Sequence, residues 1–262
     1  MLIPRRWVYT APEEWRALDE ALRTDVDDAA VAQWEAAVAD YVGVPHAAAV
    51  SSGRRGMTFI FEHLGLGAGD EVVVPAYTLG DLIPLLRGFG ATLVPADIDP
   101  QTLNVTPETV ARRLGPKTKA VLVLHAFGAP ADTAGILEAV AGREVAVVED
   151  CAHSLGAVDH KRPTGTQGYA GFFSFETTKP VNTYGGGMVV TQDASLAERI
   201  HRETADDARD TAPLRKKIGS VRTEQRLFRT GLAFPLLYLL ANPYSRALMY
   251  RLYRSAQHAP PA

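Results

Sequence analysis

Two kinds of hydrophobic pattern alternate along the first 200 residues. Short, almost continuous apolar runs are separated by stretches in which apolar residues recur at three- and four-residue steps. Continuous apolar strands that alternate with helices are typical of a mostly parallel sheet covered on both faces. We therefore expect an α/β fold with strands at 47–50, 71–75, 91–99, 120–127, 144–151, 171–175 and 188–191.

The helical pattern begins at Pro12 and is clearest over residues 30–43. There the apolar side chains follow helical spacing and Gly43 ends the segment, which predicts an amphipathic helix with an apolar face of Val31, Trp34, Val38 and Tyr41. Further helices are expected at 55–64, 107–114, 132–141 and 196–209, with one more through Leu85.

The two ends of the chain are predicted to be different from the rest. Residues 1–12 are expected to form an irregular arm, so that 1–205 would be one large domain. Residues 206–226 are polar and rich in basic side chains without clear periodicity, which predicts a mobile loop. Residues 227–262 are apolar and aromatic, and two interpretations stay open. In the first, they are packed terminal helices. In the second, 227–254 lies on a membrane surface, and its longest uncharged run is too short to span a bilayer.

Composition narrows the class of protein. A chain of 262 residues with 47% hydrophobic and 22% charged residues is typical of a soluble globular protein. The net charge of −3 provides no field suited to binding nucleic acid. A single cysteine, Cys151, permits no internal disulfide, fits a reducing cytoplasm and suggests no metal cluster. No charged segment followed by an apolar one opens the chain, so we expect a cytoplasmic protein.

Chemically active side chains gather where predicted strands end. In α/β sheets ligands bind at the carboxyl ends of strands. These positions hold Tyr77, Thr78, Asp97, Asp99, His125, Asp150, His153, Ser174 and Lys179. Lys179 stands between a strand and a three-glycine turn, where burial would lower the pKa of its amine and let it attack carbonyls. The alternative is an ordinary surface lysine.

The segment SSGRRGM, residues 51–57, joins a strand to a helix. This arrangement points free backbone N–H groups at an anion, commonly a phosphate, although Ser52 could simply cap the helix. A ligand with an aldehyde, a phosphate and a basic ring nitrogen, such as pyridoxal 5′-phosphate, would need a lysine, a carboxylate and a phosphate site. Lys179, Asp150 and the 51–57 turn with Ser174 could supply them.

A resemblance to a known family supports this interpretation. The runs SSGRRG, GDEVVVPAYT, GATLVPADIDPQTLNVTPE, KTKAVLVLHAFGAPAD, VVEDCAHSLGA and FFSFETTKPVNTYGGGMVVT follow one another in the order found in the DegT/DnrJ/StrS family of pyridoxal-phosphate sugar aminotransferases. The resemblance covers about residues 20–200. It implies a fold type I large domain, a three-layer αβα sandwich with a mixed, mostly parallel sheet, whose usual C-terminal small domain is missing or truncated here.

The resemblance also implies roles for single residues. Lys179 matches the lysine that bonds to the cofactor, Asp150 the partner of the ring nitrogen, and His153 the position beside the ring and its hydroxyl. Ser174 matches a serine that contacts the phosphate, and the phosphate turn is occupied by Gly53, Arg54 and Arg55. Relatives with histidine in place of the lysine perform dehydration, so Lys179 argues against that branch.

Several positions depart from the family pattern, one near the ring and others in the phosphate turn. Leu79 stands where many members place an aromatic side chain that stacks on the ring, and Tyr77 lies close by in the sequence. We expect both to border the cofactor. Arg54 and Arg55 stand where many members have threonine and a small residue, so they add charge at the phosphate or point to solvent.

The implied reaction is transfer of an amino group from glutamate or glutamine to a keto group of a nucleotide-activated sugar, for polysaccharide or natural-product sugar biosynthesis. Fold type I sites form at a subunit interface, so a homodimer is expected. Two alternatives stay open. One is a truncated, noncatalytic relative that binds the cofactor or a partner. The other is an aminotransferase whose acceptor is a cyclitol or another non-nucleotide ketone.

Overall fold

The computed structural model describes residues 10–23, 28–205 and 211–229. The chain divides into two compact units, which are described separately below. The larger comprises residues 27–207, and the smaller comprises 1–26 together with 208–262. This division differs from the expected single domain over 1–205, because the first helix belongs with the C-terminal segment.

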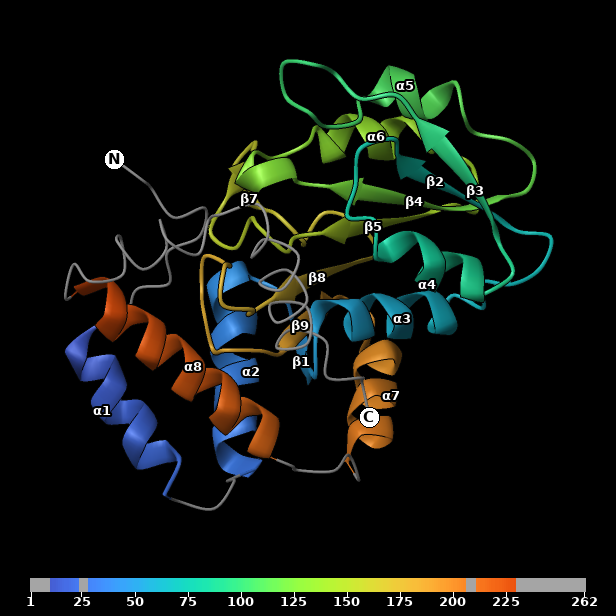
Figure 1. Ribbon diagram of the computed structural model, residues 1–262. Coiled ribbons are helices and arrows are strands. Elements are labelled where there is room, and N and C mark those ends of the chain that lie inside the picture. Colours follow the sequence, from blue (N-terminus) through green and yellow to red (C-terminus); the bar gives the residue numbers. More distant parts are fainter. Residues whose placement is uncertain (1–9, 24–27, 206–210, 230–262) are drawn as a thin grey trace. The chain divides into compact units, whose positions relative to one another are not determined.

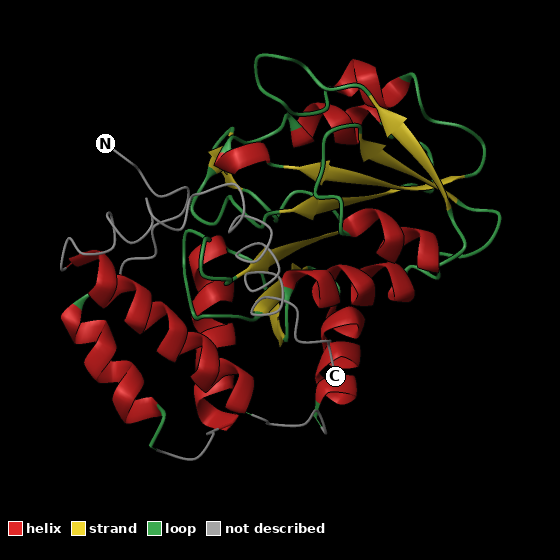
Figure 2. Cartoon of the chain, in the orientation of Figure 1, coloured by secondary structure: helices red, strands yellow, loops and turns green. Residues whose placement is uncertain are grey.

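A seven-stranded sheet forms the centre of the larger unit (Figures 1 and 2). Its strand order is β1-β9-β8-β5-β4-β2-β3. β9 runs antiparallel to both of its neighbours, and the remaining pairs are parallel, which confirms the mixed, mostly parallel sheet. The strands are β1 (His46–Val50), β2 (Glu71–Pro75), β3 (Thr92–Ala96), β4 (Thr118–Leu124), β5 (Ala146–Asp150), β8 (Ala170–Ser174) and β9 (Gly187–Thr191).

Helices cover both faces of the sheet, which makes the three-layer αβα sandwich that the sequence predicted. Alternate side chains along each strand enter separate cores, as when Phe172 faces one layer and Phe173 the other. One face packs against α3 (Gly53–His63), α4 (Leu82–Gly88) and α7 (Ala194–Thr204). The opposite face packs against α2 (Asp28–Val42), α5 (Pro107–Ala111) and α6 (Thr133–Ala139).

The start of α3 is fixed by local chemistry. Ser52 has extended backbone geometry and its Oγ accepts the backbone N–H of Arg55 at 3.2 Å, so Ser52 is an N-cap. Glycines let three segments meet there. A Cβ at Gly187 of β9 would lie 2.6 Å from the backbone nitrogen of Gly53. The close approach of β9, β8 and α3 therefore depends on missing side chains.

The predicted apolar face of α2 is only partly correct. Val38 and Val42 are buried, and the ring of Trp34 packs edge-on against Phe175 at 5.4 Å between centroids. Tyr41 is 66% exposed and Val31 is also exposed, contrary to the expectation that both would face the core.

Two small elements were not predicted. A two-stranded antiparallel ribbon consists of β6 (Val158–Asp159) and β7 (Arg162–Pro163), and a short 3₁₀ turn, η1, spans Ala126–Gly128. Both lie in connections that follow strands of the main sheet, where a sequence pattern of two or three residues carries little signal.

The smaller unit contains α1 (Pro12–Ala21) and α8 (Ala212–Arg229). The Arg222 guanidinium donates to Asp19 at 2.7 Å and lies 4.4 Å from the centre of the Trp15 ring. The expected loop over 206–226 is therefore wrong from residue 212 on. Basic residues surround the few apolar ones, and the buried pair Ile218 and Val221 was too sparse to reveal the helix.

The segment for which we left a membrane interpretation open falls mostly outside the described residues. Only 227–229 of the 227–262 tail are described, as the end of α8, and residues 1–9 of the arm also lie outside. Within the described part of the chain, no helix combines the length and apolar character needed to cross a membrane.

Candidate functional site

Lys179 lies in the turn that follows β8, and its side chain faces His153. The backbone N–H of Lys179 donates to Glu176 O at 2.9 Å, and Lys179 Nζ lies 2.8 Å from His153 Nε2. Burial lowers the pKa of Lys179, although the charges of Asp150 and Glu176 oppose this effect. Burial, with the charge of Lys179, also lowers the pKa of His153. Both shifts make the neutral form of each side chain easier to reach than it is in water.

Asp150 ends β5, and the charge of Lys179 acts on its carboxylate. Burial raises the pKa of Asp150 to about 6, despite a hydrogen bond from the backbone N–H of Ala152 at 3.0 Å and the charge of Lys179. Among the described residues, Ala152 provides the one hydrogen bond that the carboxylate accepts. A buried acid with so few donors is suited to accept a proton or a positively charged N–H from a ligand.

The turn at the start of α3 lies against the end of β8. A Cβ at Gly53 would lie 3.2 Å from Ser174 Cβ, which places Ser174 beside the first turn of the helix. Free backbone N–H groups and the positive end of the helix dipole make such a turn suitable for an anion.

The two arginines of this turn are already engaged. Arg54 Nη1 pairs with Asp81 Oδ2 at 3.1 Å. The Arg55 guanidinium lies 4.0 Å from the centre of the Phe59 ring and 3.9 Å from Glu62, so its side chain extends along α3. For Arg55, the backbone N–H also serves the Ser52 cap.

The loop after β2 carries Tyr77, Thr78 and Leu79. Tyr77 is 48% exposed and Leu79 is 57% exposed. The Oγ1 atom of Thr78 is buried and lacks a hydrogen-bond partner in the described part of the chain. The Tyr77 ring lies 6.2 Å from that of Phe127, which is parallel within 2° to the ring of His153 at 6.2 Å. Phe127 was not singled out from the sequence, although its place before Gly128 in a strand-end turn was a signal.

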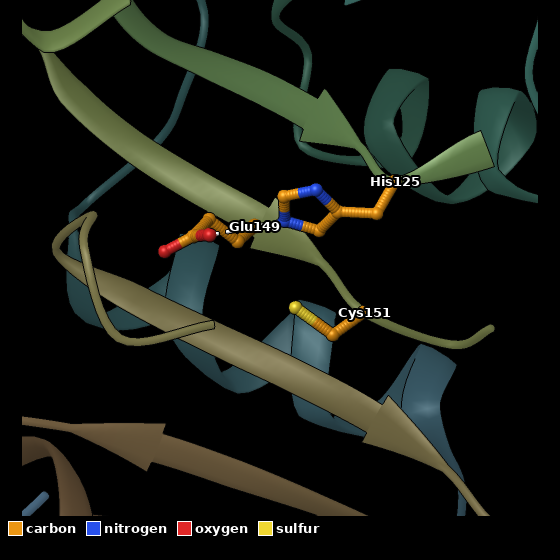
Figure 3. A group of neighbouring side chains, drawn as sticks. All are labelled: His125, Glu149 and Cys151. Atoms are coloured by element: carbon orange, nitrogen blue, oxygen red, sulfur yellow. Dashed lines mark hydrogen bonds and ion pairs between the residues drawn. The ribbon is translucent and has the colours of Figure 1, made fainter. Parts of the chain in front are cut away.

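Glu149, the neighbour of Asp150 in β5, belongs to a polar network with His125, and both side chains are fully buried (Figure 3). Glu149 Oε2 accepts from His125 Nε2 at 3.0 Å, and His125 Nδ1 accepts the backbone N–H of Ala131 at 3.0 Å. The carboxylate also accepts three backbone N–H groups, of Gly165, Gln167 and Gly168, at 2.8–2.9 Å. Because Nδ1 accepts a hydrogen bond, it carries no hydrogen, so the ring is neutral and its Nε2–H donates to Glu149.

Cys151 lies close enough to His125 and Glu149 for the three to surround a metal ion (Figure 3). The hydrogen bonds just described already occupy both ring nitrogens and both carboxylate oxygens. Burial and the charges of Glu149 and Asp150 also raise the pKa of the Cys151 thiol, which disfavours the thiolate that a metal requires. We interpret the group as a structural network. Burial raises the pKa of Glu149, but its hydrogen bonds from His125, Gly168 and Gly165 outweigh this and leave the pKa lowered.

Two of the strand-end residues make their described contacts outside the site. Asp97 has a largely exposed side chain and lies 3.9 Å from Arg113. The Asp99 carboxylate accepts hydrogen bonds from Gln101 N and Thr102 Oγ1, and so stabilises its own turn. His125 is buried in the network, while Lys179 lies within hydrogen-bond distance of His153 and its charge acts on Asp150.

The arrangement fits the group that the sequence resemblance implies. It offers an amine with a lowered pKa, a buried carboxylate with one donor, a helix start beside a serine, and the unpartnered Oγ1 of Thr78. Comparison with known proteins identifies the class. The sequence model of the DegT/DnrJ/EryC1/StrS aminotransferase family matches residues 10–226, and the chain belongs to this family.

Particular relatives share this part of the chain. The L-glutamine:2-deoxy-scyllo-inosose aminotransferase of Micromonospora echinospora is 35% identical over 193 residues, which are 74% of this chain and 46% of the relative. Its counterpart from Streptomyces fradiae is 38% identical over 170 residues, covering 65% of this chain and 40% of the relative. The chain thus spans about half the length of the curated relatives it matches.

Solved structures give the same fold. An aminotransferase from Psychrobacter cryohalolentis superposes with a TM-score of 0.71 at 32% identity, over 74% of this chain and 51% of that one. A 3-amino-5-hydroxybenzoic acid synthase superposes with a TM-score of 0.69 at 30% identity, over 78% of this chain and 56% of that one. Both matches support the assignment to the fold type I class.

Proposed function

We propose that this chain carries the cofactor-binding half of a pyridoxal-phosphate-dependent aminotransferase. Its amino donor would be glutamate or glutamine, and its acceptor a ketone on a polyhydroxylated six-membered ring. The observation that carries the proposal is Lys179, which has a lowered pKa, lies 2.8 Å from His153 and is in electrostatic contact with Asp150. Solved relatives that hold the cofactor support it, such as the E. coli GDP-4-keto-6-deoxy-D-mannose-3-dehydratase with bound hydrated PLP at 28% identity.

In this proposal each residue has one task. Pyridoxal phosphate supplies the electron sink. Asp150 holds the proton of the ring nitrogen, because a charged N–H gives its carboxylate the donor that it lacks. Lys179 Nζ, whose pKa is lowered by burial, takes a proton from the donor carbon and returns it. The turn of Gly53, Arg54 and Arg55 with Ser174 holds the phosphate, and His153, Tyr77 and Leu79 border the ring.

The names of the relatives favour one acceptor class over another. Four curated relatives at 34–38% identity are aminotransferases of inososes, which are cyclitol ketones. Two solved structures, at 28% and 36% identity, contain nucleotide-linked sugars, GDP-perosamine and a TDP-sugar product. The ranges of identity overlap, so the acceptor class shared by all four curated relatives is what favours the cyclitol ketone. The nucleotide-activated sugar is the second candidate.

Visible absorption of the purified protein with added pyridoxal phosphate tests the proposal. We expect a band from cofactor bonded to Lys179 that glutamate or glutamine discharges and that Lys179→Ala lacks. An inosose or a nucleotide keto sugar should then restore the band, and whichever does so identifies the acceptor. A band that no amino donor discharges would favour a noncatalytic relative. No band in the unmodified protein would overturn the proposal.

Assembly with a second chain is part of the proposal. Sites of this fold class form between two copies of the chain, so we expect a homodimer. The part of the chain shared with the relatives covers less than half of each relative. Sedimentation of the cofactor-loaded protein measures the association state. A monomer with full activity would refute the expected dimer.

A further inference from the structure

Phe127 combines two unfavourable features. Its ring is 67% exposed, the largest exposure among the large hydrophobic side chains that the structure describes as exposed. Its backbone has φ 53° and ψ 22°, the left-handed region that a bulky side chain rarely occupies. Residues held in such conformations are concentrated at ligand sites, where the surrounding structure enforces them.

The surrounding structure does hold this turn firmly. The side chain of the buried Asn104 accepts the backbone N–H of Ala126 at 2.9 Å and donates to Ala129 O at 3.0 Å, so it spans Phe127 from both sides. His125, itself held by the buried Glu149, accepts the N–H of Ala131 (Figure 3). Two buried polar side chains therefore keep an exposed aromatic ring in a strained position.

The Phe127 ring is connected to Lys179 through His153. The Phe127 ring lies parallel to that of His153, whose Nε2 is 2.8 Å from Lys179 Nζ. The ring of Tyr77, which is 48% exposed, also lies 6.2 Å from that of Phe127. The next residue, Gly128, has φ 89°, and a Cβ there would lie 2.9 Å from His153 O, so the turn sits against the His153 backbone. Tyr77, Phe127 and His153 thus form an aromatic row that leads away from Lys179.

We propose that Phe127, the most exposed member of this aromatic row, binds the face of the acceptor ring and so selects a cyclic, polyhydroxylated ketone. The C–H groups on one face of such a ring carry small positive charges and match the negative face of an aromatic ring. Exposed aromatic groups beside a few polar ones are typical of small-molecule sites. This inference rests on the proposed function, because it assigns the acceptor subsite of the same site.

Three variants of Phe127 separate the ring from the backbone strain. Phe127→Ala and Phe127→Gly both remove the ring, but only glycine adopts φ 53° without strain. Phe127→Tyr keeps the aromatic face. We expect the Ala and Gly variants to raise the KM for the acceptor about tenfold or more, equally, with the discharge of the cofactor by glutamate unchanged. The Tyr variant should behave as the unmodified protein. A loss confined to Phe127→Ala would assign the effect to the backbone and overturn the proposal.

A binding measurement keeps this test separate from catalysis. Saturation-transfer NMR with 2-deoxy-scyllo-inosose should show transfer from the unmodified protein to ring C–H protons, and none from Phe127→Gly. If the unmodified protein fails to transaminate, the proposed function fails, while this measurement still decides the subsite. Equal transfer from both proteins would overturn it. So would dissociation of a dimer in Phe127→Gly on sedimentation, which would assign the row to contact between two copies of the chain.

Discussion

Glu149 and Asp150 are neighbours in β5, both are buried, and they lie on opposite sides of the sheet in opposite chemical conditions. Glu149 accepts four hydrogen bonds, three of them from backbone N–H groups, and its pKa is lowered. Asp150 accepts one, and burial raises its pKa to about 6. Burial acts on both carboxylates, so the number of donors decides the direction of the shift.

The comparison distinguishes a structural carboxylate from one prepared for a ligand. The donors around Glu149 come from the connection between β5 and β8, and they fix the path of the chain into the strand that ends at Ser174. Asp150 faces Lys179, and its missing donors are what a protonated ring nitrogen could supply. Four predictions test this contrast, from the largest expected effect to the smallest.

Replacing Glu149, the structural carboxylate, should lower the free energy of unfolding most. Glu149→Gln puts an amide N–H₂ where the carboxylate accepts N–H groups, so buried donors lose their acceptor. We expect the free energy of unfolding to fall by about 3–5 kcal/mol. Urea denaturation measures it, with the exposed Glu144, just before β5, as the control. Glu144→Gln should change stability by less than about 0.5 kcal/mol. A similar small change in Glu149→Gln would contradict the structural role.

Replacing Asp150 in the cofactor-free protein should instead increase stability as the pH rises. Its folded-state pKa of about 6 lies above the ordinary aspartate pKa of 3.8, so between these pH values the folded state binds more protons than the unfolded state. This group therefore makes the protein less stable as the pH rises through that window, by about 3 kcal/mol in all. Asp150→Asn removes the effect. The stability of the variant relative to the unmodified protein should be higher at pH 8 than at pH 4.

Denaturation of both proteins at the two pH values measures this difference. An equal difference at pH 4 and pH 8 would show that Asp150 titrates normally. With pyridoxal phosphate added, the same variant should bind the cofactor more weakly, because it lacks the charge for the ring nitrogen.

A smaller loss of stability is expected at Gly168, whose backbone N–H is one of the donors to Glu149. A Cβ at Gly168 would lie 2.4 Å from the backbone oxygen of Val147, so Gly168→Ala must shift the connection. We expect a loss of about 2 kcal/mol. Gly185, on the side of Lys179, has nothing within 4 Å of such a Cβ. Gly185→Ala is the matched control, and thermal denaturation should show it close to neutral. Equal losses would place the packing constraint on both sides of β5.

The least effect is expected at the exposed pair of Arg54 and Asp81. Both side chains are more than half exposed, and such pairs contribute about 0.5 kcal/mol. Asp81→Asn should therefore leave stability nearly unchanged in urea denaturation at low salt, and any change should vanish at high salt. If the variant weakens binding of inorganic phosphate, Asp81 orients Arg54 for the anion. If it strengthens binding, Asp81 competes for Arg54.

Much of the fold followed from the hydrophobic pattern. Strand β2 was predicted with its observed bounds, because Val72, Val73 and Val74 are buried on both faces and read as a continuous apolar run. α8 could not be predicted, since its buried residues are few and a helix with a mostly charged surface shows little periodicity. The exposure of Tyr41 likewise depends on which neighbour α2 packs against, which its own sequence does not specify.

For the site, the sequence indicated residue types and strand ends but not their contacts. The interaction of Lys179 with His153 and Asp150 agrees with that pattern. The left-handed backbone of Phe127 was not predictable, because it depends on a clamp by Asn104, which is far away in the sequence. Nor did the sequence show that the Arg55 side chain extends along its own helix.

The position of β1 in the sheet has a consequence for folding. This strand is at the edge and its single partner is β9, so His46 pairs with Thr191 across most of the larger unit. During synthesis β1 and the turn at Ser52 emerge long before that partner, while β2, β3, β4 and β5 can already pair. Contacts so distant in sequence form slowly. We therefore expect the turn at Ser52 to be among the last parts to form. A nascent chain that stops before β9 should lack this turn.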